Sequence, residues 1–199
     1  MQQQQGAAAA APFVPGTVCK LWDDFPPFFT LQPNDATRAT QLEQWGGLLL
    51  AHCRHQRVTL LPALAEWPLW GNPRLQRALP AEGIAAVAEH LVARRRAEWA
   101  DASRVTLRVL FKTVEEWGVL VLAAVQRCGY YDELKTLSDM TEDLGLGQEF
   151  YRLEDELMVR VLRHLAAKGH CQISEDAATG GGAFGVLFSS SHASVGGGV

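Results

Sequence analysis

The feature that most constrains the fold of this chain is an internal repeat with a period of just over 70 residues. Apolar side chains recur at helical spacing between residues 35 and 55, and the stretch 115–127 has the same design. A second helical stripe also returns, after a closely similar offset, and two matching offsets indicate a duplication, so we expect two similar halves. The matching positions are Trp45, Leu48 and Leu49 with Trp117, Leu120 and Val121, and Leu79, Glu82, Ile84, Val87 and Leu91 with Leu153, Glu156, Met158, Val161 and Leu165.

Each half has the element order of a winged-helix domain. Asn34 and Asp35 are available to cap the first helix, and Gly129 follows the end of its counterpart. Helix, short element, helix, helix and a two-stranded wing is a variant of helix-turn-helix. The predicted fold class is therefore α+β, mainly α, with two tandem winged-helix domains and disordered N- and C-terminal tails. The expected wing strands are 98–99 with 105–111 in the first half and 171–174 with 185–188 in the second.

The composition of the chain ends sets the expected domain boundaries. Residues 1–20 are a Gln/Ala/Pro stretch, and the chain is rich in glycine from residue 179 onward. Both segments are too poor in bulky apolar groups to offset the entropy of ordering, so from 176 onward we expect only a short strand near Phe188. The predicted organisation is a disordered tail 1–20, an aromatic, proline-rich docking arm 21–33, winged helix 1 at 34–113, winged helix 2 at 114–188 and a disordered tail 189–199.

The composition argues against a membrane span and against secretion. The longest apolar run, Val119 to Val125, is far shorter than the roughly 18 residues that a spanning helix needs. No basic side chain precedes Cys19, so the charged start of a signal peptide is missing. The four cysteines lie far apart and show no CxxC spacing. We therefore expect reduced thiols in a cytoplasmic protein.

A helix-turn-helix fold raises the alternative of a DNA-binding transcription or chromatin factor. Residues 21–114 carry a net charge of +2, but residues 115–199 hold six basic against thirteen acidic side chains. The last helix of the second half opens with acidic residues, which a phosphate backbone repels. The basic residues 94–96 end a helix, where they complement its dipole. No nucleic acid partner is predicted.

Residue patterns for catalysis or metal binding are weak. His52 and His55, three residues apart, have no third ligand at a recognisable spacing, and neither do His164, His170 and Cys171. GxxxxGK[ST] and GxGxxG phosphate-binding motifs are missing from the sequence. We expect no enzyme activity, no catalytic residues, no cofactor and no metal.

The most informative segment is the arm at 21–33, hereafter the aromatic arm. It places four large aromatic residues within eight positions and is interrupted by prolines, which favour an extended, polyproline II conformation. Two interpretations remain open: the arm folds back over its own domain, or its rings enter a groove on another protein. Both hold if Trp22 and Leu31 tether the arm while residues 26–29 project. The candidate docking residues are Trp22, Phe25, Pro26, Pro27, Phe28, Phe29 and Leu31.

The run Trp-Asp-Asp-Phe-Pro-Pro-Phe-Phe-Thr-Leu-Gln-Pro-Asn at 22–34 resembles the N-terminus of the vacuolar protein-sorting-associated protein 25 family, the small tandem winged-helix subunits of the ESCRT-II complex. The order and spacing of further motifs extend the resemblance to about residues 21–188. These motifs are Pro68-Leu69-Trp70-Gly71-Asn72, Leu75-Gln76-Arg77-Ala78-Leu79-Pro80, Glu98-Trp99, Glu115-Glu116-Trp117-Gly118, Thr141-Glu142-Asp143, Glu149-Phe150 and Gly185-Val186-Leu187-Phe188.

This resemblance implies a non-catalytic subunit that sorts ubiquitinated membrane cargo into multivesicular bodies. It implies that the first winged helix and the Pro-Pro-x-Phe segment, here Pro26, Pro27 and Phe29, dock onto the two larger ESCRT-II subunits. It also implies that the second winged helix recruits the initiating ESCRT-III subunit, which presents a basic helix. The protein is expected in the cytoplasm and at the endosomal membrane, in indirect membrane contact through the complex. A homodimer is not predicted.

Charge alone selects the candidate residues for the ESCRT-III contact. The net charge of −7 in residues 115–199 complements a basic partner and would speed encounter. The alternative is that these carboxylates form a solvated face. The candidates are Glu142, Asp143, Glu154, Asp155 and Glu156.

Overall fold

The computed structural model describes residues 12–142, 150, 153–175 and 184–189. The chain divides into two compact units between Phe111 and Lys112, which we call domain 1 and domain 2. The division lies two residues before the boundary expected from the sequence. Within the described residues, no helix is both long and apolar enough to cross a membrane.

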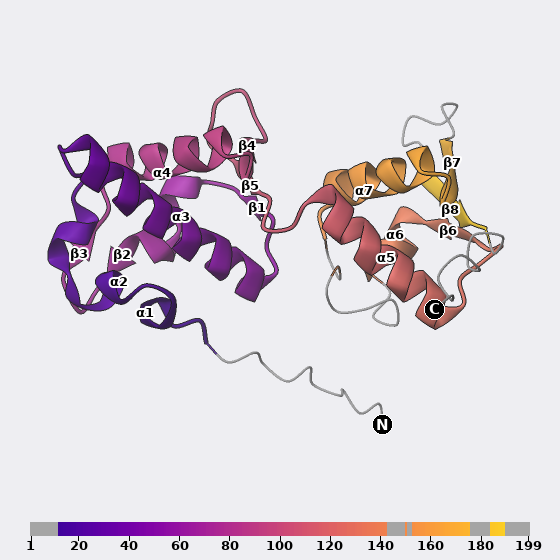
Figure 1. Cartoon of the computed structure of the whole chain (residues 1–199), viewed down its shortest axis with the longest axis horizontal. Helices are drawn as coiled ribbons and strands as arrows, with labels where there is room; N and C mark the ends of the chain where they lie inside the picture. Colours follow the sequence, from indigo (N-terminus) through magenta and orange to yellow (C-terminus); the bar gives the residue numbers. More distant parts are fainter. Residues whose placement is uncertain (1–11, 143–149, 151–152, 176–183, 190–199) are drawn as a thin grey trace, which may run out of the picture. The chain divides into compact units, whose positions relative to one another are not determined.

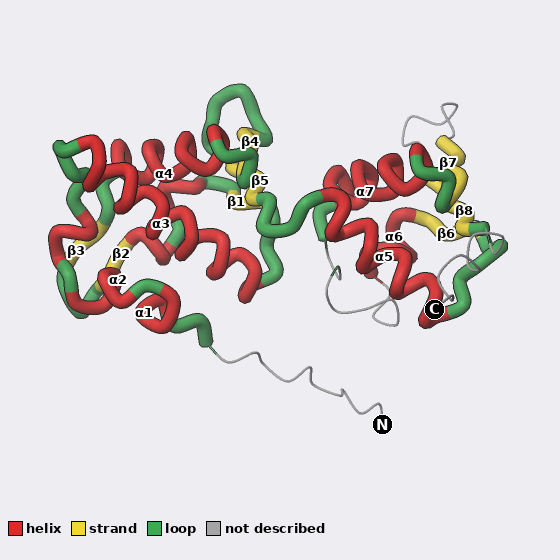
Figure 2. The backbone as a smooth tube through the Cα atoms, in the orientation of Figure 1, coloured by secondary structure: helices red, strands yellow, loops and turns green. Residues whose placement is uncertain are grey.

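Domain 1 has two long helices, several short turns and a small sheet (Figures 1 and 2). Its elements in chain order are α1 (Pro15–Val18), α2 (Lys20–Asp24), η1 (Pro26–Phe29), α3 (Asp35–Gln56), β1 (Leu60–Leu61), η2 (Leu64–Glu66), η3 (Pro68–Trp70), β2 (Gly71–Asn72), β3 (Arg77–Ala78), α4 (Ala81–Ala93), β4 (Ala97–Trp99) and β5 (Leu107–Val109).

Over its described residues, domain 2 repeats the plan with fewer elements (Figure 1). They are α5 (Val114–Cys128), β6 (Leu134–Thr136), α6 (Leu137–Glu142), α7 (Asp155–Ala167), β7 (Cys171–Glu175) and β8 (Phe184–Phe188).

Local signals in the sequence explain where α3 and α5 begin and where α5 ends. The Asn34 side chain caps α3 by accepting a hydrogen bond from the Thr37 amide at 3.0 Å. Thr113 and Glu116 form a reciprocal capping box at the start of α5. Gly129 ends α5 in the left-handed conformation with a φ of 70°. The predicted helices at 35–55 and 115–127 are confirmed.

The wings also follow the prediction. In domain 1 the sheet order is β1-β5-β4, and in domain 2 it is β6-β8-β7, with every pairing antiparallel. Glu98 faces Arg108 across the β4–β5 hairpin, and Ile173 faces Val186 across the β7–β8 hairpin. Each wing gains a third strand from the segment between the first and last helices, which the sequence did not predict as a strand.

The middle helix expected in each domain is present only in domain 2, as α6. In domain 1 the corresponding stretch forms the 3-10 turns η2 and η3 and the small β2–β3 hairpin. Pro62, Pro68 and Pro73 lie in this stretch, and a proline inside a helix removes a hydrogen bond and clashes with the preceding turn.

The N-terminal tail needs a correction. Residues 12–20 were expected to be disordered, but within them Pro15–Val18 form α1 and Lys20 begins α2. The ring of Phe13 lies edge-on against the His52 imidazole, with ring centroids 4.9 Å apart, and this contact helps to offset the entropy of ordering. The remaining parts of the expected tails, 1–11, 176–183 and 190–199, lie outside the described residues.

The duplication extends to the contact between α3 and α4 in domain 1 and the contact between α5 and α7 in domain 2. A Cβ on Gly46 of α3 would lie 3.0 Å from Cδ2 of Leu91 in α4, and a Cβ on Gly118 of α5 would lie 3.1 Å from Cδ2 of Leu165 in α7. The same offsets of 72 and 74 residues relate these two contacts. A glycine in each domain therefore lets the two helices approach closely, although neither glycine belongs to the predicted apolar stripes.

We expect Gly46→Val to lower the free energy of unfolding of domain 1 by about 1–3 kcal/mol, because two methyl groups must enter the space that Leu91 fills. Gly47→Val is the matched control, since a Cβ there meets no atom within 4 Å. Urea unfolding followed by far-UV circular dichroism measures both. Equal stability of the two variants would contradict the close approach.

Candidate partner-docking site

The aromatic arm is helical rather than extended. Residues 20–24 form α2, and Pro26–Phe29 form the 3-10 turn η1. The amide of Phe28 donates to the Phe25 carbonyl at 3.0 Å, and that of Thr30 to the Pro27 carbonyl at 3.1 Å. The prediction of polyproline II was wrong because the fixed φ of proline suits the first turn of a helix as well as an extended chain, and Pro26 and Pro27 occupy that first turn.

Phe28 and Phe29 belong to the core of domain 1. Each ring is only 2% exposed. Phe28 stacks on Trp45 with ring centroids 4.5 Å apart and an interplanar angle of 4°, and Phe29 meets the same indole edge-on at 5.5 Å. The expectation that residues 26–29 all project was therefore wrong for these two rings. Burying them on Trp45 removes a large apolar area from water.

Polar contacts from α3 hold the C-terminal half of the arm. The side chain of Gln41 donates to the carbonyls of Phe28 and Thr30 at 2.8 and 2.9 Å, and it accepts from the Gln32 amide at 3.1 Å. The Trp45 indole donates to the Phe28 carbonyl at 3.0 Å. The arm therefore makes main-chain hydrogen bonds with the same helix on which its rings pack.

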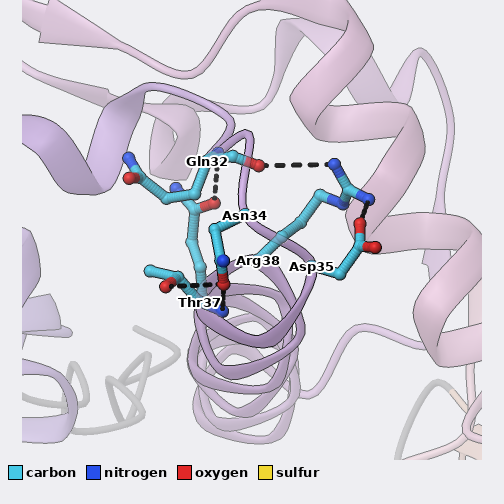
Figure 3. A network of polar contacts seen from close by, with 6 residues as sticks. Gln32, Asn34, Asp35, Thr37 and Arg38 are labelled. Carbon is cyan, nitrogen blue, oxygen red and sulfur yellow. Dashed lines mark hydrogen bonds and ion pairs between the residues drawn. The ribbon is translucent and has the colours of Figure 1, made fainter.

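The end of the arm is also bound to the first turn of α3. Figure 3 shows the Arg38 guanidinium donating to the Gln32 carbonyl, at 3.4 Å, while it pairs with Asp35. In the same view Asn34 caps the helix through the amide and hydroxyl of Thr37. Helix capping and attachment of the arm thus share one polar network.

The N-terminal half of the arm is held by residues that follow α3 in the sequence. The Trp22 indole donates to the Leu69 carbonyl at 3.0 Å, and the Trp22 carbonyl accepts from the Asn72 side chain at 2.7 Å. Arg74 donates to the Asp23 carbonyl. Trp22 is half-buried and tethers the arm as expected, and Leu31 is half-buried near its other end.

The arm exposes fewer of its candidate docking residues than the sequence indicated. Phe25 is 46% exposed, and Pro26 and Pro27 are exposed beside it. We call these three residues the Phe25 face. A groove of about 450 Å³ adjoins it, lined by Phe25 and Pro27 on the arm and by side chains of α3 such as Thr40 and Gln44. An apolar surface with an amide-bearing wall is suited to a side chain from another protein.

The structure also places the residues considered for catalysis. The rings of Phe13 and Trp67 contact the His52 ring, and burial, followed by the electrostatic interaction with His55, lowers the pKa of His52. In the described part of the chain, no group of three or more His, Cys, Asp or Glu side chains is placed to hold a metal ion.

All four cysteines are free thiols. Burial raises the pKa of Cys53 to about 12 and that of Cys171 to about 11, so neither is a reactive thiolate at neutral pH.

The acidic candidates in domain 2 lie on two helices. Glu154 is half-buried at the N-cap position of α7 and makes no side-chain cap hydrogen bond. Asp155 and Glu156 are exposed in the first turn of α7, where carboxylates complement the helix dipole. Glu156 also pairs with Arg160 at 2.9 Å. Glu142 is exposed at the end of α6, and Asp143 lies outside the described residues.

We expect Phe29→Ala to lower the free energy of unfolding by about 3–5 kcal/mol, because the ring is buried against Trp45. Phe25→Ala, the matched variant in the same arm, should cost about 1 kcal/mol or less. Thermal unfolding of the two variants compares them directly. A stable Phe29→Ala variant would show that the arm does not belong to the core.

Comparison with known proteins places the chain in a family. Residues 23–154 match the model of the family described as ESCRT-II complex subunit. Vacuolar protein-sorting-associated protein 25 of Homo sapiens is 37% identical over 153 residues, covering 75% of this chain and 86% of its own length. The protein of that name from Arabidopsis thaliana is 30% identical over 147 residues, covering 73% of this chain and 82% of its own length.

Solved structures share the fold. The crystal structure of subunit VPS25 of the endosomal trafficking complex ESCRT-II superposes with a TM-score of 0.73 at 19% identity, covering 84% of this chain and 96% of that one. A VPS22/VPS25/VPS36 structure of ESCRT-II superposes with a TM-score of 0.66 at 20% identity, with the same coverage of both chains. The tandem winged-helix fold agrees with these structures. The chain belongs to the ESCRT-II complex subunit family, in its vacuolar protein-sorting-associated protein 25 group, and is a non-catalytic subunit of endosomal protein sorting.

Proposed function

We propose that domain 1 docks onto the two larger ESCRT-II subunits through the Phe25 face. The observation that carries this proposal is that Phe25, Pro26 and Pro27 are exposed on the arm. Both ends of the arm are hydrogen-bonded to the rest of domain 1. A rigid aromatic and proline surface binds at low entropic cost. The related VPS25 chain has been solved together with VPS22 and VPS36, which supports the same kind of partner here.

The candidate docking residues divide into two roles. Phe25, Pro26 and Pro27 make the contact, and the half-buried Trp22 and Leu31 lie at its margins. Phe28 and Phe29 hold the Phe25 face in place from the core of domain 1, because their rings remain packed on Trp45. In the Pro-Pro-x-Phe segment, the two prolines therefore contact the partner, whereas Phe29 holds the segment on the core of domain 1.

For domain 2 we propose a contact with a basic segment of the initiating ESCRT-III subunit. Asp155 and Glu156 are exposed at the start of α7, and Glu142 is exposed at the end of α6. Exposed carboxylates of this kind speed the encounter with a basic helix more than they raise affinity. Asp143 and Glu154 remain part of the proposed surface. Bridging the two complexes would place the protein at the endosomal membrane, where ubiquitinated cargo enters multivesicular bodies, with membrane contact only through the complex.

The DNA-binding alternative has little in its favour. In a helix-turn-helix protein the N-terminal residues of the recognition helix meet the bases. In domain 2 the last helix, α7, begins with acidic side chains, which duplex DNA repels. The relatives reported above are sorting proteins and give this alternative no support.

We expect the double variant Phe25→Ala/Pro27→Ala to lose co-purification with the two larger ESCRT-II subunits, because it removes the exposed ring and one proline of the Phe25 face. Its melting temperature should stay close to that of the unchanged protein. Val105→Ala, which removes methyl groups from a side chain 51% exposed on the domain 1 wing, is the control and should still co-purify. Retained co-purification of the double variant would refute the proposed face.

For the acidic surface, we expect Glu142→Lys/Asp155→Lys to slow association with the initiating ESCRT-III subunit about tenfold at low salt. The effect should shrink as salt screens the charges. Glu115→Lys is the control, because Glu115 is also a first-turn carboxylate, on α5. Stopped-flow association kinetics measure all three proteins. Equal rates for the double variant and the control would refute the assignment.

A further inference from the structure

Two buried side-chain amides serve the aromatic arm. Gln41 is 5% exposed and Asn72 is 2% exposed. Removing an amide from water is costly unless its hydrogen bonds are replaced. Both amides form hydrogen bonds with main-chain atoms of the arm.

The three hydrogen bonds described above for the Gln41 side chain are all made with the arm. Its amide nitrogen bridges two carbonyls two residues apart, those of Phe28 and Thr30, and its oxygen binds the amide of Gln32. An aliphatic side chain at this position could pack against the rings but could not fix these three main-chain groups. Gln41 thus sets the path of the chain directly after the Phe25 face.

Asn72 acts at the opposite end of the arm. Its nitrogen donates to the Trp22 carbonyl at 2.7 Å, while its oxygen accepts from the amides of Arg74 and Leu75 at 2.9 and 3.2 Å. The same side chain therefore shapes the turn of the β2–β3 hairpin and binds the arm to that turn. The Phe25 face lies between the residues that the two amides hold, Trp22 and Phe28.

We propose that Gln41 and Asn72 are positioning residues, which hold the Phe25 face in its binding conformation before the partner arrives. This inference rests on the proposed docking function. Asn72 lies outside the groove beside the Phe25 face, whereas Gln41 is among the residues that line this groove. Each amide orders the arm before the partner binds, so binding no longer has to offset the entropy that a loose arm would lose. Weakening either anchor should therefore lower affinity without changing any residue of the Phe25 face.

Two variants test this inference. Gln41→Leu keeps a side chain of similar size and removes its three hydrogen bonds to the arm. Asn72→Asp keeps the oxygen that the amides of Arg74 and Leu75 need, but it replaces the donor to Trp22 with a second carboxylate oxygen and adds a negative charge. Gln126→Leu, on an exposed position of α5, is the matched control.

The measurement is the Kd for the purified pair of larger ESCRT-II subunits, with amide hydrogen exchange of Gln32 as a readout of the arm. We expect both positioning variants to bind about tenfold more weakly, with faster exchange at Gln32 in Gln41→Leu, while Gln126→Leu matches the unchanged protein. In a double-mutant cycle, Gln41→Leu should cost less affinity when Phe25 is already Ala, because both changes act through one surface.

The outcomes separate this inference from the function on which it rests. If Phe25→Ala/Pro27→Ala leaves binding intact, the proposed docking function itself fails. If that variant loses binding but Gln41→Leu or Asn72→Asp keeps full affinity, the positioning role is overturned alone. Unfolding of domain 1 by the uncharged variant Gln41→Leu, or additive losses in the cycle, would assign the amides to stability and overturn it as well.

Discussion

The stacking of Phe28 on Trp45 is the contact on which domain 1 depends. The indole of Trp45 is fully buried, and it also meets Phe29 and the indole of Trp70. This cluster joins the N-terminal arm, the first helix and the segment after it into a single core. Because two rings of the arm enter the cluster, the neighbouring ring of Phe25 is left at the surface. The position of the proposed docking face is therefore set by the packing of Phe28 on Trp45.

The two domains share a helix contact but use their surfaces differently. Gly46 and Gly118 allow the same close approach to Leu91 and Leu165. The second copy of the core tryptophan, Trp117, has the ammonium of Lys112 over its ring, at 5.6 Å, in place of an aromatic arm. The two proposed contact surfaces also differ, since the one on domain 1 is apolar and the one on domain 2 is acidic.

Several elements could be predicted because their signals are local. The caps at Asn34 and Thr113 and the glycine at 129 mark helix ends within a few residues of the positions they control. The Gln41 amide was missed, although a polar residue four positions before Trp45 on the helix face that packs on the arm is a readable signal. The middle element of domain 1 was only partly predicted, because prolines exclude a helix without specifying which turns replace it.

The sequence by itself determined two winged-helix domains with an aromatic and proline segment before the first, because periodicity, capping and repetition act over short distances along the chain. Only the tertiary structure decided that this segment is helical, that Phe28 and Phe29 are buried and that Phe25 is exposed. Proline permits both conformations, and the choice between them depends on Trp45, 17 residues after Phe28 in the sequence, and on Asn72, 50 residues after Trp22. Partners so distant along the chain leave no periodic or local pattern, and only the folded packing brings them together.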